Sequence, residues 1–136
     1  MRTLNATAVL VVDDDADHAH IARLVLNSLA PTTGVEVVHD AASAIARLAA
    51  LPRGGVVLID RRLHGIESFD TVVEMRLRRP DVNVVMLSAA LSSIDRAYAL
   101  ACGAVDALEK PASLAGWREA LASIVGAGTD AAPRAA

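Results

Sequence analysis

Short apolar runs alternate with longer stretches of helical periodicity along nearly the whole chain. Five runs rich in branched apolar residues are expected to be strands: 8–12, 35–38, 56–59, 82–87 and 105–108. Each run is followed by apolar residues spaced three and four apart, which is typical of one face of a helix. This strict alternation predicts an α/β fold, in which a parallel sheet lies between two layers of helices.

The same spacing predicts which helix faces are buried, and several residues mark where the helices begin or end. Prolines and Gly103 are expected to stop helices, while Asp40 and a capping box at 92–95 are expected to start them. The side chains expected on the buried faces are Ile21, Leu24, Val25, Leu29, Ala42, Ile45, Leu48, Ala49, Phe69, Val72, Val73, Leu77, Ile94, Ala97, Tyr98, Ala101, Leu114, Trp117, Leu121, Ile124 and Val125.

The charge balance and the cysteine content restrict the partners and the compartment. The formal net charge is -3, from 13 basic and 16 acidic side chains, which provides no basic face for nucleic acid or for a membrane surface. No apolar stretch approaches the ~20 residues that cross a bilayer, and the first residues do not form a secretory signal. Cys102 has no second cysteine to pair with. We therefore expect a cytoplasmic protein without direct membrane or nucleic-acid contact.

The length of 136 residues is enough for one domain with its own core. We expect that domain over residues 1–126. Residues 127–136 are rich in Ala, Gly and Pro and carry no periodic pattern, so we expect a disordered C-terminal tail or linker there.

Polar side chains end four of the five expected strands. Asp13 and Asp14 follow the first, Asp60 follows the third, Ser88 follows the fourth, and Lys110 comes just after the fifth. In a parallel α/β sheet, ligands bind beyond the carboxyl ends of the strands, where the strand order reverses. The pattern therefore predicts one crevice that holds three carboxylates, a hydroxyl and an ammonium group.

Such a crevice suits a divalent cation and a phosphoryl group. Three carboxylates close together repel one another unless a positive charge is added. Mg²⁺ prefers oxygen ligands, and the absence of soft ligands disfavours zinc. An ionised aspartate can attack phosphorus to form an acyl phosphate, and the metal, Lys110 and Ser88 can stabilise the charge that develops.

Four segments at these strand ends resemble the receiver domain of bacterial two-component response regulators. They are VLVVDDD (9–15), VVLIDRRLHG (56–65), VVMLSAA (84–90) and GAVDALEKP (103–111), within a resemblance that runs from about residue 7 to 126. The resemblance implies a flavodoxin-like, three-layer, doubly wound (βα)5 fold with strand order 2-1-3-4-5. It also implies a Mg²⁺-dependent signalling domain that phosphorylates itself and slowly dephosphorylates itself, rather than an enzyme of repeated turnover.

The resemblance further implies a role for each site residue. Asp60 would be the phosphoacceptor. Mg²⁺ would be bound by Asp14, by Asp60 and by the backbone carbonyl of Arg62, with Asp13 acting mostly through water. Ser88 would bond the phosphoryl group and move with it, and Lys110 would pair with that group or, before transfer, with Asp60.

The implied partners are a histidine kinase or histidine phosphotransfer protein as donor and an unknown downstream protein as target. Phosphorylation would shift a pre-existing equilibrium at the face formed by the fourth helix, fifth strand and fifth helix. The active form would be a monomer or a phosphorylation-dependent dimer.

The sequence departs from the usual receiver pattern at four positions. Ala107 stands where a Tyr or Phe is usual, His64 where Pro is common, and Ser68 where Gly is common. Arg62 is a large cation two residues after the acceptor. It is either a solvated side chain or, as our sharper hypothesis, a cover that hinders attack of water on the phosphoryl group.

Two other functions remain as alternatives. A pseudo-receiver that binds partners without phosphorylation is compatible with Ala107. A phosphatase of the haloacid dehalogenase type shares an Asp-x-Asp core, which Asp13 to Asp15 contain, but the expected acidic pair after the lysine is missing. The four histidines are scattered along the chain and are expected at the surface, and Trp117 is expected to anchor the core.

Overall fold

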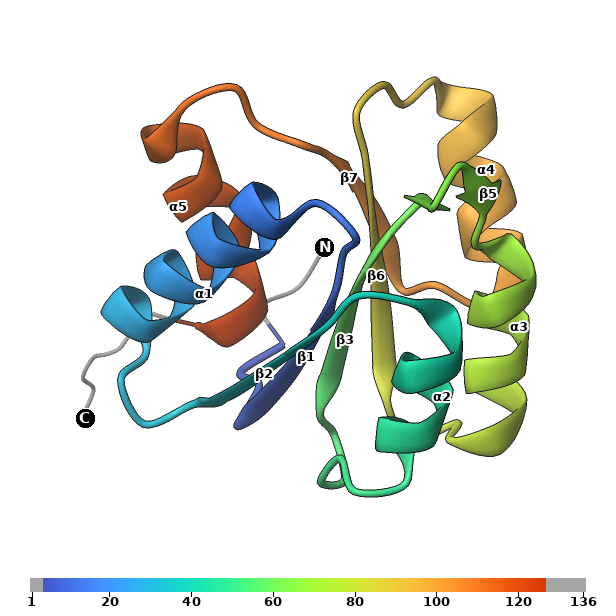
Figure 1. Cartoon of the computed structure of the whole chain (residues 1–136), viewed down its shortest axis with the longest axis horizontal. Helices are drawn as coiled ribbons and strands as arrows, with labels where there is room; N and C mark the ends of the chain where they lie inside the picture. Colours follow the sequence, from blue (N-terminus) through green and yellow to red (C-terminus); the bar gives the residue numbers. More distant parts are fainter. Residues whose placement is uncertain (1–3, 127–136) are drawn as a thin grey trace.

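The parallel sheet expected from the alternating pattern is present in the computed structural model, which describes residues 4–126 (Figure 1). Its five strands are β1 (Ala8–Val12), β2 (Gly34–Val38), β3 (Val56–Asp60), β6 (Asn83–Ser88) and β7 (Asp106–Glu109). The helices are α1 (Ala16–Leu29), α2 (Ala41–Leu48), α3 (Phe69–Arg78), α4 (Ser93–Cys102) and α5 (Leu114–Val125). The predicted tail over residues 127–136 lies outside the described residues.

The strands are ordered β2-β1-β3-β6-β7 and all pair in parallel. Counted within this sheet alone, the order is 2-1-3-4-5, so the predicted doubly wound topology is confirmed. The order reverses between β1 and β3, where Val12 pairs with Ile59. Because all strands run the same way, their carboxyl ends meet at one edge of the sheet.

Two apolar clusters fill the space on either side of the sheet. Figure 1 shows α1 and α5 covering one face and α2, α3 and α4 covering the other. Along β1, Val9 and Val11 contribute to the first cluster, while Leu10 and Val12 contribute to the second. A strand buried on both faces needs apolar residues at every position, which explains the unbroken runs in β1 and β3. Trp117 is 4% exposed and anchors the first cluster, as predicted.

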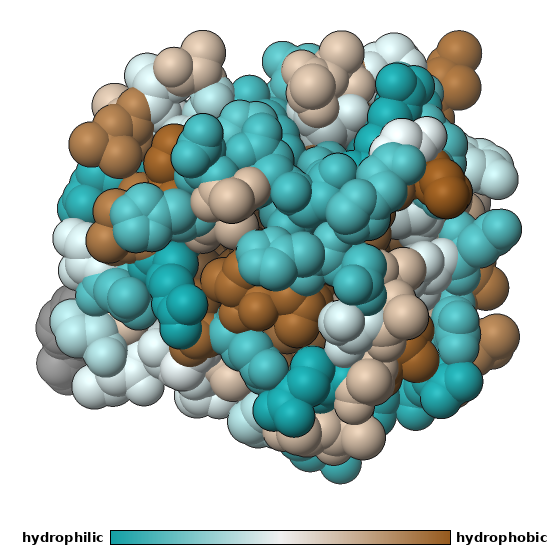
Figure 2. Space-filling view, viewed as in Figure 1, coloured by the Kyte–Doolittle hydropathy of each residue, from teal (hydrophilic) through white to brown (hydrophobic). Residues whose placement is uncertain are grey.

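The edge of the sheet formed by β2 is less completely covered than the central strand β3. Figure 2 shows apolar side chains gathered between polar ones in the middle of the view, in the region of β2. The side chains of β2 are partly or fully exposed.

Within residues 4–126, no helix combines the length and the apolar character needed to cross a membrane.

The predicted helix caps are confirmed. The Asp40 side chain accepts a bond from the Ser43 amide at 2.7 Å, and Ser92 with Asp95 forms the capping box that opens α4. Gly103 ends α4 with a φ of 118°, a conformation in which glycine is favoured because it has no Cβ.

The predicted buried faces were partly wrong. Among the residues predicted to be buried, the large side chains that are exposed are Leu24 at 54%, Val73 at 38%, Leu77 at 80%, Ile94 at 79%, Tyr98 at 55% and Leu114 at 65%. The alanines that are exposed are Ala42, Ala49, Ala97 and Ala101. The buried residue of α4 is Ala99, whereas α3 buries Val72 and Met75. Spacings of three and four show that a helix has an apolar face. In a helix rich in alanine, however, two neighbouring faces match that spacing equally well, so the sequence does not show which of them is buried. In α4 the small side chain of Ala99 occupies the inner face and is fully buried.

The segment after β3 forms a short hairpin that the sequence interpretation did not include. Strands β4 (Arg62–Leu63) and β5 (Ile66–Glu67) pair antiparallel. The two residues between them, His64 and Gly65, have φ values of 53° and 78°. Two positive φ values are typical of the tight turns that join hairpin strands.

Candidate functional site

Three carboxylates converge at the carboxyl edge of the sheet. One oxygen each from Asp13, Asp14 and Asp60 can be chosen so that all lie within 4.8 Å of one another. Asp13 is buried, whereas Asp14 and Asp60 are partly exposed. Hard oxygen ligands without sulfur or imidazole in the cluster fit Mg²⁺ or Ca²⁺ better than zinc.

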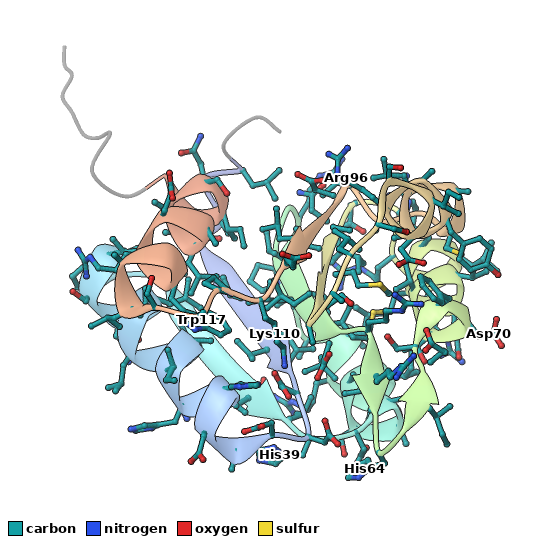
Figure 3. All side chains as sticks on the ribbon, turned by 90° about the horizontal axis from the view of Figure 1, so that it is seen from above. His39, His64, Asp70, Arg96, Lys110 and Trp117 are labelled. Carbon is teal, nitrogen blue, oxygen red and sulfur yellow. The ribbon has the colours of Figure 1, made fainter. Side chains whose placement is uncertain are left out.

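Lys110 lies in the middle of this acidic cluster. Figure 3 views the molecule from above and shows Lys110 at the centre, with Trp117 to one side and His39 and His64 at the rim. The Nζ atom lies 2.9 Å from Asp13 Oδ2 and 3.1 Å from Asp60 Oδ2, and only 9% of the side chain is exposed. The Lys110 amide donates to the Ser88 carbonyl at 2.7 Å, which fixes the lysine beside the end of β6.

The pKa values reflect this crowding of charge. Burial raises the pKa of Asp60, and the charge of Asp13 acts in the same direction, so the opposing effect of Lys110 is outweighed. Burial alone would lower the pKa of Lys110, but its bonds to Asp13 and Asp60 raise it. Lys110 is therefore a cation among three carboxylates. The excess negative charge leaves the cluster suited to a further cation.

The Asp60 carboxylate opens onto a cavity of about 490 Å³. Ser88 lies at its wall, is 4% exposed, and donates its hydroxyl hydrogen to the Ala90 carbonyl at 2.7 Å. The cavity has room for a phosphoryl group beside Asp60. Its lining consists of His18, Asp60, Arg61, Arg62, Ser88, Ala89, Ala90, Asp95 and Lys110.

The hairpin after β3 holds one side of the cluster. The His64 amide donates to Asp14 Oδ2 at 2.9 Å, and the His64 ring Nε2 lies 3.1 Å from the His39 carbonyl. The Arg62 amide lies 3.3 Å from Asp60 Oδ1. The two amide bonds orient the carboxylates of Asp14 and Asp60, and the ring bond ties the hairpin to the segment after β2.

The Arg62 side chain points along the hairpin. It is 67% exposed, and its Nε donates to Glu67 Oε2 at 2.7 Å. Arg62 nevertheless lines the cavity, so both of its predicted roles stay open.

Asp15 takes a structural role at the start of α1. Its side chain accepts bonds from the amides of Asp17 and His18 and caps α1. The second carboxylate of the Asp-x-Asp core is therefore used at the helix start. That arrangement gives no support to the phosphatase alternative.

Sequence reasoning missed two side chains at the cavity. His18 was placed at the surface, but its Nδ1 lies 2.9 Å from Lys110 Nζ. Arg61 bonds Glu67 at 2.8 Å and Asp95 at 3.1 Å, and its guanidinium lies 5.3 Å from the centre of the Phe69 ring. The available signals were the position of His18 in the first turn after the acidic pair and that of Arg61 directly after Asp60.

A family model for the response regulator receiver domain matches residues 9–122. This chain belongs to that family. Receiver domains are signalling domains, and the acidic cluster described above is the kind of site at which they bind a divalent metal. The flavodoxin-like receiver fold predicted from the resemblance is thus confirmed.

Several curated response regulators are similar to this receiver domain. The DNA-binding response regulator MtrA of Mycobacterium tuberculosis is 35% identical over 105 residues, which cover 76% of this chain and 43% of MtrA. The sensory transduction protein RegX3 of Mycolicibacterium smegmatis is 36% identical over 122 residues, which cover 87% of this chain and 49% of RegX3. The chain thus spans about half the length of the curated relatives that it matches.

Solved structures share the fold of this receiver domain. A response regulator from Thermotoga maritima has a TM-score of 0.74 at 24% identity, covering 90% of this chain and 99% of the other. A response regulator from Burkholderia pseudomallei, with a phosphorylated aspartic acid, a calcium ion and citrate, has a TM-score of 0.72 at 21% identity. That match covers 86% of this chain and 65% of the other. At these identities the comparison supports the fold alone.

Proposed function

We propose that this receiver domain accepts a phosphoryl group on Asp60 and thereby changes its binding to a partner protein. The observation that carries the proposal is the setting of the Asp60 carboxylate. It opens onto the cavity, has Lys110 at 3.1 Å, and lies within 4.8 Å of the oxygens of Asp13 and Asp14. The response regulator from Burkholderia pseudomallei, which shares this fold, carries a phosphorylated aspartic acid.

In the proposed step, an ionised oxygen of Asp60 forms a bond to phosphorus while the bond from phosphorus to the donor breaks. No general base is needed because the carboxylate has no proton to lose. We propose a histidine kinase or a histidine phosphotransfer protein as the donor, which leaves with the electron pair of its nitrogen–phosphorus bond. Lys110 donates to the transferring group, whose oxygens carry the developing charge.

We propose Mg²⁺ as the metal, held by Asp13, Asp14 and Asp60, with the backbone carbonyl of Arg62 as a further ligand. When bound, it neutralises the carboxylates and the phosphoryl oxygens. Ser88 would exchange its bond to the Ala90 carbonyl for one to a phosphoryl oxygen. That exchange would move the segment after β6, which leads into α4.

The output that we propose is a change at the face of α4, β7 and α5 that a downstream protein reads. Ala107 on β7 is 2% exposed and too small for the usual aromatic switch, so the change must pass through other contacts. We propose that the domain comprises residues 1–126, with residues 127–136 as a tail or linker. It would act in the cytoplasm, as a monomer or a phosphorylation-dependent dimer, without touching nucleic acid itself.

Intact mass after incubation with Mg²⁺ and acetyl phosphate tests the assignment of Asp60. The parent should gain one phosphoryl group, and Asp60→Asn should gain none, because an amide is not a nucleophile at phosphorus. Asp70→Asn is the matched control, since Asp70 lies on the outer side of α3, away from the cluster (Figure 3). Equal labelling of the parent and Asp60→Asn would reject the proposal.

A further inference from the structure

All three donors of the Lys110 ammonium group are occupied by distinct acceptors. Two are Asp13 Oδ2 at 2.9 Å and Asp60 Oδ2 at 3.1 Å, and the third is His18 Nδ1 at 2.9 Å. A lysine ammonium group has three donors and no acceptor. His18 Nδ1 must therefore accept, which requires that this nitrogen carries no proton.

His18 is held at its backbone and at its ring. Its backbone amide donates to Asp15 Oδ1 at 3.1 Å in the first turn of α1. Its ring lies against Trp117 of α5, with ring centres 6.3 Å apart and planes inclined by 45°. The side chain is 40% exposed. Nδ1 lies between two groups, 2.9 Å from Lys110 Nζ and 3.5 Å from Asp15 Oδ2. A carboxylate cannot donate, so an Nδ1 without a proton bonds Lys110 and makes no hydrogen bond to Asp15.

We propose that His18 is a positioning residue for Lys110 in phosphoryl transfer to Asp60. This inference rests on the proposed function. A phosphoryl group on Asp60 needs one N–H of Lys110, and the longest of the three bonds, to Asp60 Oδ2, is the one that exchanges for a phosphoryl oxygen. The bonds to Asp13 and His18 hold the ammonium group in place during this exchange.

Loss of the His18 acceptor would release one donor of Lys110. The ammonium group would then be held by carboxylates alone and would move toward Asp60, where it covers the oxygen that must attack phosphorus. Phosphorylation would slow, whereas binding of Mg²⁺ would not change, because His18 contacts none of the three carboxylates of the cluster in the structure of residues 4–126.

The test compares His18→Leu with His18→Asn. Leucine keeps an apolar contact with Trp117 but removes the acceptor, whereas asparagine places its Oδ1 where Nδ1 stood. With acetyl phosphate at saturating Mg²⁺, the limiting labelling rate of His18→Leu should fall about tenfold, as expected for one bond to a charged group. His18→Asn should recover most of that loss, and the Mg²⁺ affinity and thermal stability of both variants should match the parent. His20→Leu, at an exposed position of the same helix, should behave as the parent.

Nitrogen-15 NMR of the imidazole gives a readout that does not depend on labelling. The His18 imidazole should carry its proton on Nε2 and none on Nδ1. A proton on Nδ1, or parent-like labelling by His18→Leu, would overturn this inference and leave the proposed function intact. Failure of the parent to label would overturn both. Loss of Mg²⁺ affinity in His18→Leu, or no recovery in His18→Asn, would assign His18 a structural role and reject positioning.

Discussion

Asp60 shows how single residues at this site are governed by opposing effects. Burial and the charge of Asp13 favour its protonated form, and the ammonium group of Lys110 favours its ionised form. The structure brings together the side chains of Asp13, Asp14, Asp60, Ser88 and Lys110, as the strand-end pattern predicted. Their roles in metal binding and phosphoryl transfer stay predictions. His18 and Arg61 could not be assigned from the sequence, because their importance lies in contacts rather than in a motif.

Arg62 permits a test at the level of one side chain. We expect Arg62→Asn to shorten the lifetime of the acyl phosphate several-fold, because the large side chain at the cavity wall hinders the approach of water. The decay of labelled protein after removal of the donor measures this lifetime, and Arg53→Asn, at an exposed loop position, is the control. An unchanged or longer lifetime would mean that Arg62 acts only as the exposed partner of Glu67.

At the scale of elements, the prediction succeeded for regular structure and was only partly right about which helix faces are buried, with α4 as the clearest error. Asp40, the capping box and Gly103 act through their own backbone neighbourhood, so they could be identified from the sequence. The hairpin β4–β5 was missed because each strand has only 2 residues, too few to show a period. Its turn of His64 and Gly65 was the available signal. The hairpin has a direct consequence for the site, since it fixes Asp14 through the His64 amide.

The junction between α3 and β6 predicts a dependence of stability on pH. Arg79 donates to both carboxylate oxygens of Asp81, at 3.0 and 2.8 Å, and to the Leu48 carbonyl at 2.9 Å. The hydrogen bonds from Arg79 are the largest cause of the low pKa of Asp81, which is about 2. The pKa in the unfolded chain is higher, about 3.9. The ion pair therefore stabilises the folded protein above about pH 4, and this contribution is lost as the pH falls toward 2.

Thermal unfolding across pH tests this pair. Asp81→Asn should have a slightly lower Tm than the parent near neutral pH, and the difference should shrink as the pH falls from about 5 to about 3. Glu74→Gln removes a pair with Arg78 at the surface of α3 and should show a weaker dependence. A constant difference in Tm at every pH would show that Asp81 acts through something other than its charge.

At the scale of the whole molecule, the site exists only because the sheet is parallel. Lys110 and Asp13 are 97 residues apart, and Lys110 and Asp60 are 50 apart, yet both pairs are hydrogen-bonded. Folding thus places three carboxylates where they repel one another. This repulsion lowers the free energy of unfolding. A cation that binds this cluster must stabilise the folded state, since the cluster is absent from the unfolded chain.

Mg²⁺ is therefore expected to raise the Tm of the parent. At a Mg²⁺ concentration about one hundred times the Kd, the free energy of unfolding should increase by about 2.7 kcal/mol. Asp14→Asn should lose most of this gain, whereas Asp17→Asn should keep it, because Asp17 lies in the first turn of α1 outside the cluster. Melting curves in EDTA and in increasing Mg²⁺ measure the effect. An equal rise in the parent and Asp14→Asn would place the binding elsewhere.

The sequence by itself determined the strand and helix alternation, the helix caps, and the acidic and basic residues that end the strands. These depend on neighbours along the chain, whose spacing is fixed by covalent geometry. The tertiary structure decided which stripe of each helix faces the sheet, how the hairpin holds Asp14, and that His18 meets Lys110 across 92 residues. Such contacts depend on the packing of distant segments, where a rotation of one helix by a single residue selects a different set of side chains.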